Sequence, residues 1–158
     1  MLKPALMYRE ELMHKFSEIL YSNDYYLYTA RGDCTSLPEI KDEYNCYQYA
    51  IINSANEVIG YFSYCIEPVC DSVNNIGLIS FDKGNVIVGK DAFTEIERLI
   101  NRHHRVEWCA VSGNPAIRNY DKICKRYYGN KFVLHDTSKD LSGRYRDLYI
   151  YEIIARTK

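Results

Sequence analysis

The sequence has no long hydrophobic run, almost no net charge and no closely spaced pair of cysteines. None of its apolar stretches approaches the ~20 residues that a membrane-spanning helix needs, and residues 1–4 do not open the apolar core of a signal peptide. The formal net charge of −1 excludes a general electrostatic attraction to nucleic acid or anionic membranes. We therefore expect a cytoplasmic protein.

The cysteines also favour a cytoplasmic protein. There are six of them, none forms a CxxC pair, and several lie inside apolar runs, as buried thiols do. A reduced protein without a disulfide framework is the expectation. His103, His104, Cys109 and His135 lack the paired spacing of a zinc site, so no metal is expected.

The chain is long enough for one domain over residues 1–158, which would bury ~70% of its unfolded surface. Tyrosine is abundant, with sixteen copies. Because tyrosine combines a large apolar ring with a polar tip, the excess fits an aromatic-lined substrate cleft. It equally fits compositional bias together with strand propensity, and this is the simpler interpretation.

Hydrophobic periodicity and breaker residues predict the element order β-α-(α)-β-β-β-α-β-α-β-β. Helices are expected over 8–20, 90–102 and 115–128, and a connector over 21–45 holds at most one short helix. Strands are expected over 2–5, 46–52, 58–66, 74–81, 106–111, 131–135 and 148–154. This order implies a mixed α/β (α+β) sheet with helices on both faces.

The most informative stretch is Ser112-Gly113-Asn114-Pro115-Ala116-Ile117-Arg118-Asn119-Tyr120-Asp121-Lys122, which follows an apolar strand and opens a helix. It resembles the second half of the GNAT acyltransferase fold, whose element order is also the one predicted here. The resemblance implies a central, mostly antiparallel sheet of about six or seven strands. It also implies acetyl-CoA as co-substrate and an amine as acceptor.

Three further segments are similar to the same family. Leu2-Lys3-Pro4-Ala5 resembles its opening strand, and Glu57-Val58-Ile59-Gly60-Tyr61-Phe62 its second hairpin arm. Ile79-Ser80-Phe81, leading to Gly89 and a helix, occupies the place of the pyrophosphate-binding motif. The resemblance implies that the coenzyme is bound around Ile79, Phe81, Val88, Gly89, Lys90, Asp91 and Asn114.

The pyrophosphate motif is also where the chain departs from the family pattern, Gln/Arg-x-x-Gly-x-Gly/Ala. Of Val86-Ile87-Val88-Gly89-Lys90-Asp91 only the central glycine matches. Lys90 offers a compensating charge, but the Asp91 carboxylate could cap the helix and take the N–H groups that a phosphate would use. If the Asp91 side chain turns away, backbone binding of the coenzyme survives.

Tyr120 lies four residues after Ala116, at the position that the resemblance assigns to protonating the departing thiolate. A tyrosine packed under the helix is an equally good interpretation. Asp82 and Glu67, at predicted strand ends, are candidates for a general base, and Glu107 on the next predicted strand is a third. Lys122, Lys125 and Arg126 share a helix face that could meet the 3′-phosphate of coenzyme A, although a solvated face is the simpler interpretation.

These residues favour a GNAT-like N-acetyltransferase that transfers acetyl directly from acetyl-CoA to a primary amine. The acceptor is a small molecule or a protein, and a homodimer is compatible with the resemblance. The alternative is a catalytically inactive GNAT-fold interaction protein that has lost coenzyme binding. A binder of single-stranded nucleic acid fits the tyrosine count but not the charge.

Overall fold

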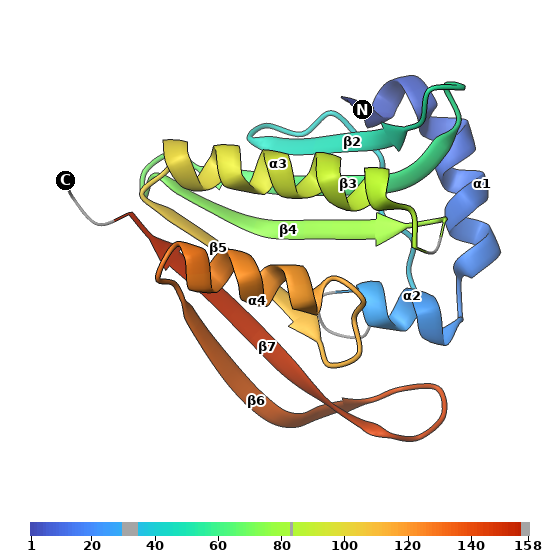
Figure 1. The fold of residues 1–158 in the computed structure, drawn as a ribbon. Coiled ribbons are helices and arrows are strands. Elements are labelled where there is room, and N and C mark those ends of the chain that lie inside the picture. The colour runs from blue at the N-terminus through green and yellow to red at the C-terminus, as the bar shows by residue number, and fades with distance from the viewer. Residues whose placement is uncertain (30–34, 83, 156–158) are drawn as a thin grey trace.

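The computed structural model describes residues 1–29, 35–82 and 84–155 (Figure 1). The helices are a 3-10 turn at Ala5–Tyr8 and α1 (Arg9–Ile19), α2 (Asn23–Tyr28), α3 (Val86–Arg102) and α4 (Ile117–Arg126). The strands are β1 (Leu2–Pro4), β2 (Cys46–Ile52), β3 (Val58–Glu67), β4 (Ser72–Ser80), β5 (Arg105–Val111), β6 (Asn130–Lys139) and β7 (Tyr145–Ile154). The predicted element order is confirmed.

All seven strands form one sheet in the order β1-β2-β3-β4-β5-β7-β6. Every neighbouring pair is antiparallel except β4 and β5, which run parallel. The predicted mixed, mostly antiparallel sheet of six or seven strands is therefore confirmed.

The two parallel strands stay together only where they begin. Ser72 pairs with Arg105 and Val73 with Val106, and no later residue of β4 is paired with β5. β4 nevertheless continues to Ser80 and β5 to Val111. The sheet is therefore split between the C-terminal ends of these two strands.

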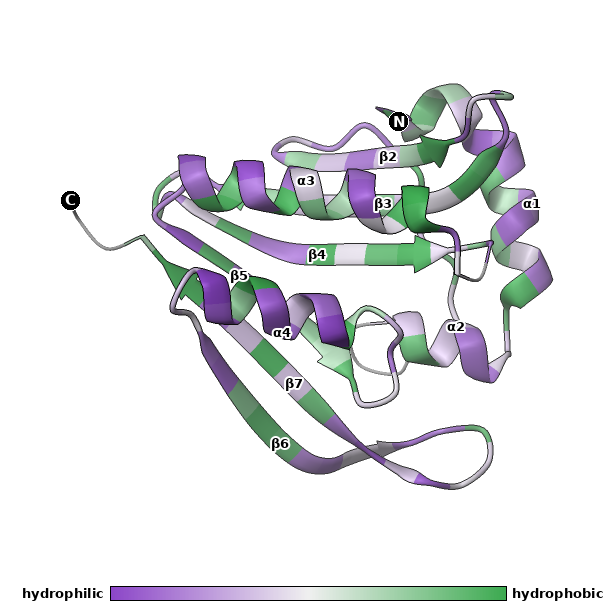
Figure 2. Ribbon diagram, in the orientation of Figure 1, coloured by the Kyte–Doolittle hydropathy of each residue, from purple (hydrophilic) through white to green (hydrophobic). Residues whose placement is uncertain are grey.

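The helices cover both faces of the sheet, as predicted. Helices α3 and α4 share one apolar core with β3, β4, β5 and β7, while α1 and α2 share a second core on the opposite face. Figure 2 shows hydrophilic and hydrophobic residues alternating along α3 and α4, as expected for helices with one buried side. None of the helices in the described part of the chain combines the length and hydropathy that a membrane span requires.

Helix α3 begins four residues before the position that periodicity predicted. Asn85 starts it, because its side-chain oxygen accepts a hydrogen bond from the amide of Ile87 at 2.9 Å. The predicted connector over 21–45 does hold one short helix, α2, which is capped by the Ser22 hydroxyl. Residues 30–34 of that connector lie outside the described residues.

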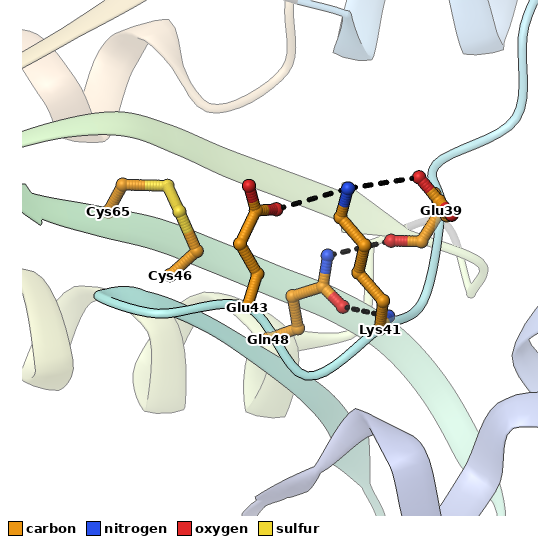
Figure 3. The surroundings of a disulfide bond; sticks show 6 residues. All are labelled: Glu39, Lys41, Glu43, Cys46, Gln48 and Cys65. Carbon is orange, nitrogen blue, oxygen red and sulfur yellow. Dashed lines mark hydrogen bonds and ion pairs between the residues drawn. A yellow bond between two sulfur atoms is a disulfide. The ribbon is translucent and has the colours of Figure 1, made fainter.

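The expectation of a fully reduced chain is wrong, because Cys46 and Cys65 form a disulfide (Figure 3). The two cysteines are 19 residues apart in the sequence, but the register of the β2–β3 hairpin places them directly opposite each other. The adjoining segment is held beside β2 by Gln48, whose side chain bonds to the backbone of Lys41 and of Glu39. Cys34 lies outside the described residues.

Candidate active site

A cavity of about 610 Å³ lies between α3 and α4, beside the split in the sheet. Leu78 and Ser80 of β4 contribute one wall, and Pro115 and Ala116 contribute another, just before α4. Cavities of this size bind small molecules and cofactors. Val88, Gly89 and Lys90, three of the residues that the resemblance assigns to coenzyme binding, line this cavity.

The charges in the cavity wall are mainly positive. Lys90 of α3 and Lys122 and Arg126 of α4 line it, together with Glu97. Glu97 pairs with Arg126 at 2.7 Å, whereas Lys90 and Lys122 make no ion pair within the described residues. Two uncompensated ammonium groups therefore favour an anionic ligand, which is the charge type of coenzyme A.

The N-terminal turn of α3 adds to this preference. The first N–H groups of a helix lack partners inside the helix and carry a partial positive charge. The side-chain oxygen of Asn85 accepts a hydrogen bond from the amide of Ile87. Val86 and Val88, on either side of Ile87, line the cavity. The remaining amides of this turn are suited to a phosphate.

Gly89 contributes no side chain to the cavity wall, and its backbone does not bend the chain. It lies within α3 with ordinary helical geometry, and its φ angle is not positive. A Cβ added there would approach only Phe93, at 4.0 Å. The missing side chain therefore keeps open the part of the cavity next to the first turns of α3.

Asp91 does not cap α3 and does not line the cavity. Its carboxylate pairs instead with the terminal ammonium of Met1, which also donates a hydrogen bond to the carbonyl of Ile52. Because successive residues of a helix point about 100° apart, Asp91 faces β1 and β2 while Gly89 and Lys90 line the cavity. The predicted charge conflict between Asp91 and a bound phosphate is thereby removed.

The amides of Ile79 and Phe81 do not reach the split edge of β4. The N–H of Phe81 donates to the carbonyl of Ile59 on β3, at 3.0 Å. Because successive N–H groups of a strand point to opposite edges, the amide of Ile79 also faces β3, and that of Ser80 faces the split. Ser80, not its neighbours, offers the backbone donor.

Asn114 uses both ends of its side chain within the protein. Its carbonyl oxygen accepts from the amide of Ala116, and its amide donates to the carbonyl of Leu27, each at 2.8 Å. The side chain is therefore a buried link between α2 and the start of α4. It does not line the cavity, although Pro115 and Ala116, which it holds, do.

Tyr120 lies behind the cavity wall. Its side chain is only 3% exposed and contacts the rings of Phe93, Trp108 and Tyr151, with centroid distances of 5.4 to 5.7 Å. Burial raises the pKa of this phenol far above its ordinary value. Phe93 lines the cavity in front of it.

Glu67 and Asp82, two of the three candidate general bases, lie beside opposite ends of β4, and the third, Glu107 of β5, pairs with Arg105. Glu67 pairs with Ser72 at the beginning of β4, whereas Asp82 follows the end of that strand, roughly 25 Å away. The structure therefore does not bring Glu67 to the cavity. Asp82 accepts a hydrogen bond from Asn85 and lines a smaller hollow of about 280 Å³ on the α1 side.

Sequence reasoning did not identify Tyr28 or Glu97 as residues of the cavity. Tyr28 of α2 is the one tyrosine among the described residues that lines it. Its position in an irregular connector gave no signal, because nothing local tells which later strand α2 will contact. The sequence did single out Lys122, Lys125 and Arg126, and the structure separates them: Lys122 and Arg126 line the cavity, and Lys125 does not.

The chain resembles known proteins in its structure but not in its sequence. No family model and no curated protein sequence matches the chain. Among solved structures, it is similar to a probable GNAT-family acetyltransferase from Chromobacterium violaceum ATCC 12472, with a TM-score of 0.61 and 14% identity over 97% of this chain and 85% of the other.

Two further solved structures are also similar to this chain. A proposed phosphinothricin N-acetyltransferase has a TM-score of 0.63 and 14% identity over 91% of this chain and 95% of its own. Another probable acetyltransferase has a TM-score of 0.53 and 18% identity over 72% of this chain, which spans only 64% of that protein's length. The chain therefore has the fold of the GNAT acetyltransferases.

Proposed function

We propose that the chain is an N-acetyltransferase that moves an acetyl group from acetyl-CoA directly to a primary amine. The observation that carries the proposal is the cavity beside the split of β4 and β5, with two unpaired lysines in its wall. An anionic, elongated thioester fits such a site by charge and by shape.

Each part of the wall has a task in this proposal. The first-turn amides of α3 and the ammonium of Lys90 hold the pyrophosphate. Lys122 and Arg126 meet a further phosphate at the other wall. The amide of Ser80, at the split edge of β4, donates to the thioester carbonyl and stabilises the negative charge that develops there during attack.

The acid and base steps remain predictions. The attacking amine must be neutral, so a base must take its proton, and Asp82, which follows the end of β4, is the candidate carboxylate that we assign to this step. The resemblance assigns the thiolate to Tyr120, but this side chain lies behind Phe93 and does not line the cavity. The acceptor is a small molecule or a protein with an exposed amine.

The alternative, an inactive interaction protein, is less well supported. It drew its support from the replacement of a small residue by Asp91, whose carboxylate would repel the coenzyme. That carboxylate pairs with Met1, and Gly89 leaves the wall open. The remaining replacement, Val86, is 81% exposed and leaves the backbone amides of the turn unchanged.

Calorimetric titration with acetyl-CoA tests the proposal, with desulfo-CoA and ATP as control ligands. We expect saturable binding of both coenzyme ligands and much weaker binding of ATP, which lacks the pantetheine arm. Absence of binding at millimolar acetyl-CoA would contradict the proposal. Binding would justify an acceptor screen in which free thiol release is measured with amines, amino acids and peptides.

A further inference from the structure

Helix α2 carries three tyrosines that differ in what their hydroxyl groups do. The Tyr25 hydroxyl donates to the carbonyl of Ser36 at 2.7 Å, and the Tyr26 hydroxyl bonds to the Ser138 hydroxyl at 2.5 Å. Both rings are buried. The Tyr28 hydroxyl has no hydrogen-bond partner among residues 1–29, 35–82 and 84–155, and its side chain lines the cavity.

The position of Tyr28 follows from the split in the sheet. Helix α2 packs with α1 on the face opposite to α3 and α4, and it contacts both β4 and β5 near their C-terminal ends (Figure 1). The cavity lies between α3 and α4 beside the split, and Tyr28 lines it although α2 packs on the opposite face of the sheet. The hydrogen bond from Asn114 to the Leu27 carbonyl holds this end of α2 in place.

Tyr28 belongs to the cavity wall but to neither of the two helices that carry the charged lining residues. It shares the wall with Ser80, the last residue of β4, and with Ala116 at the start of α4. The charged side chains lie elsewhere, on α3 and α4. A coenzyme whose phosphates meet those charges has its thioester end directed toward Ser80 and Tyr28.

We propose that Tyr28 is a catalytic residue of the acetyl transfer, donating its phenolic proton to the sulfur of coenzyme A. The inference rests on the proposed function. As the amine nitrogen bonds to the acetyl carbon, the carbon–sulfur bond breaks and its electron pair stays on sulfur. The Oη–H proton of Tyr28 goes to that sulfur, and the proton released by the amine returns through solvent to the phenolate.

The surroundings of Tyr28 keep the phenol protonated. Burial, and the negative charge of Asp24 on the same helix, raise its pKa above the ordinary value of tyrosine. The other charged groups of the cavity are Lys90, Lys122, Arg126 and Glu97. A phenol that does not ionise at neutral pH is present as a donor throughout the working range.

Tyr28→Phe tests the proposal without a known acceptor. In the complex with free coenzyme A, the ultraviolet absorbance of the thiolate is followed against pH. A donor to the thiolate lowers the pKa of the bound thiol, so removing the Tyr28 hydroxyl should raise that pKa by about one unit. Desulfo-CoA, which lacks the sulfur, should bind wild type and variant equally.

Two matched variants serve as controls. Tyr26→Phe removes a hydroxyl of the same helix that bonds away from the cavity, and Tyr120→Phe removes the hydroxyl behind the wall. Both should leave the thiol pKa at its wild-type value. Once an acceptor is found, Tyr28→Phe should lower kcat by about 100-fold at unchanged acetyl-CoA affinity.

The outcomes separate the two proposals. If coenzyme A binds and Tyr28→Phe leaves the thiol pKa unchanged, the role of Tyr28 is overturned while the proposed function stands. A rise seen only in Tyr120→Phe assigns the proton to Tyr120 and likewise overturns it. If wild-type protein binds no coenzyme, the proposed function fails, and the inference fails with it.

Discussion

Two neighbouring parts of the same sheet are built in opposite ways. Strands β2 and β3 pair from Cys46 with Cys65 to Ile52 with Val58, and the disulfide joins them at one end. Strands β4 and β5 share two paired positions and then separate. The first region is a closed frame, and the second leaves backbone donors of β4 free for a ligand.

The difference extends to the glycines of the two regions. A Cβ at Gly60 on β3 would lie 2.8 Å from the carbonyl oxygen of Ile79 and 3.1 Å from Val88. A Cβ at Gly89 on α3 would have only Phe93 nearby, at 4.0 Å. One glycine permits close packing of sheet and helix, and the other maintains an opening.

Breaking the cross-link of the closed region should have the largest effect. The disulfide closes a loop across a sequence separation of 19 residues, so the variant Cys46→Ser/Cys65→Ser should lose about 3 kcal/mol of unfolding free energy. Urea unfolding with and without reductant measures this loss. Cys70→Ser, which removes an exposed thiol, is the control and should unfold like wild type. An equal stability of both variants would contradict the prediction.

Gly60→Ala should destabilise the closed region through overpacking. The added methyl group meets a backbone oxygen that cannot rotate away, and we expect a loss of about 2 kcal/mol of unfolding free energy. Thermal or urea unfolding measures it. A variant as stable as wild type would show that β3 can shift relative to β4 and α3 without cost.

Removing a positive charge from the cavity wall tests the region where β4 and β5 separate. Lys122→Ala should weaken acetyl-CoA binding about fivefold at low salt, because an exposed ion pair contributes about 1 kcal/mol or less. The effect should shrink as salt screens the charges. Lys125→Ala, on the same helix but outside the cavity wall, is the matched control and should bind normally. Equal losses in both variants would indicate a general charge effect.

Gly89→Ala should give the smallest change in stability and the opposite sign to Gly60→Ala. Alanine in a helix is about 0.8 kcal/mol more favourable than glycine, and the open space accommodates the methyl group. Unfolding free energy should therefore rise while acetyl-CoA affinity falls, since the methyl group occupies the cavity. Calorimetry on the same preparation measures the affinity. Unchanged affinity would place the coenzyme away from this turn.

Much of the fold could be predicted from local patterns. The spacing of Phe93, Ile96 and Ile100 identified α3, and the turn at residues 53–56 identified the β2–β3 hairpin. The opposition of Cys46 and Cys65 did not follow from the turn alone, because it depends on the register shift between Ile51 and Ile52. Antiparallel pairing of β3 and β4, by contrast, already separates Glu67 from Asp82.

The candidate cavity includes some of the residues that the resemblance assigned to the site and leaves out others. Gly89 and Lys90 were identified and line the cavity, whereas Asp91 and Asn114 face other partners. A motif gives the order of residues but not the direction of each side chain. Tyr28 could not be found in this way, because it comes from a segment about 50 residues before the end of β4.

The sequence by itself determined the order of the elements and the amphipathic faces of the helices, since these depend on periods of two and 3.6 residues along the chain. Only the tertiary structure decided where β4 and β5 separate and which side chains enter the gap. It also decided that the Asp91 carboxylate faces Met1 and that Cys46 meets Cys65. The physical reason is that these features depend on strand register and helix packing between distant segments, which no local pattern encodes.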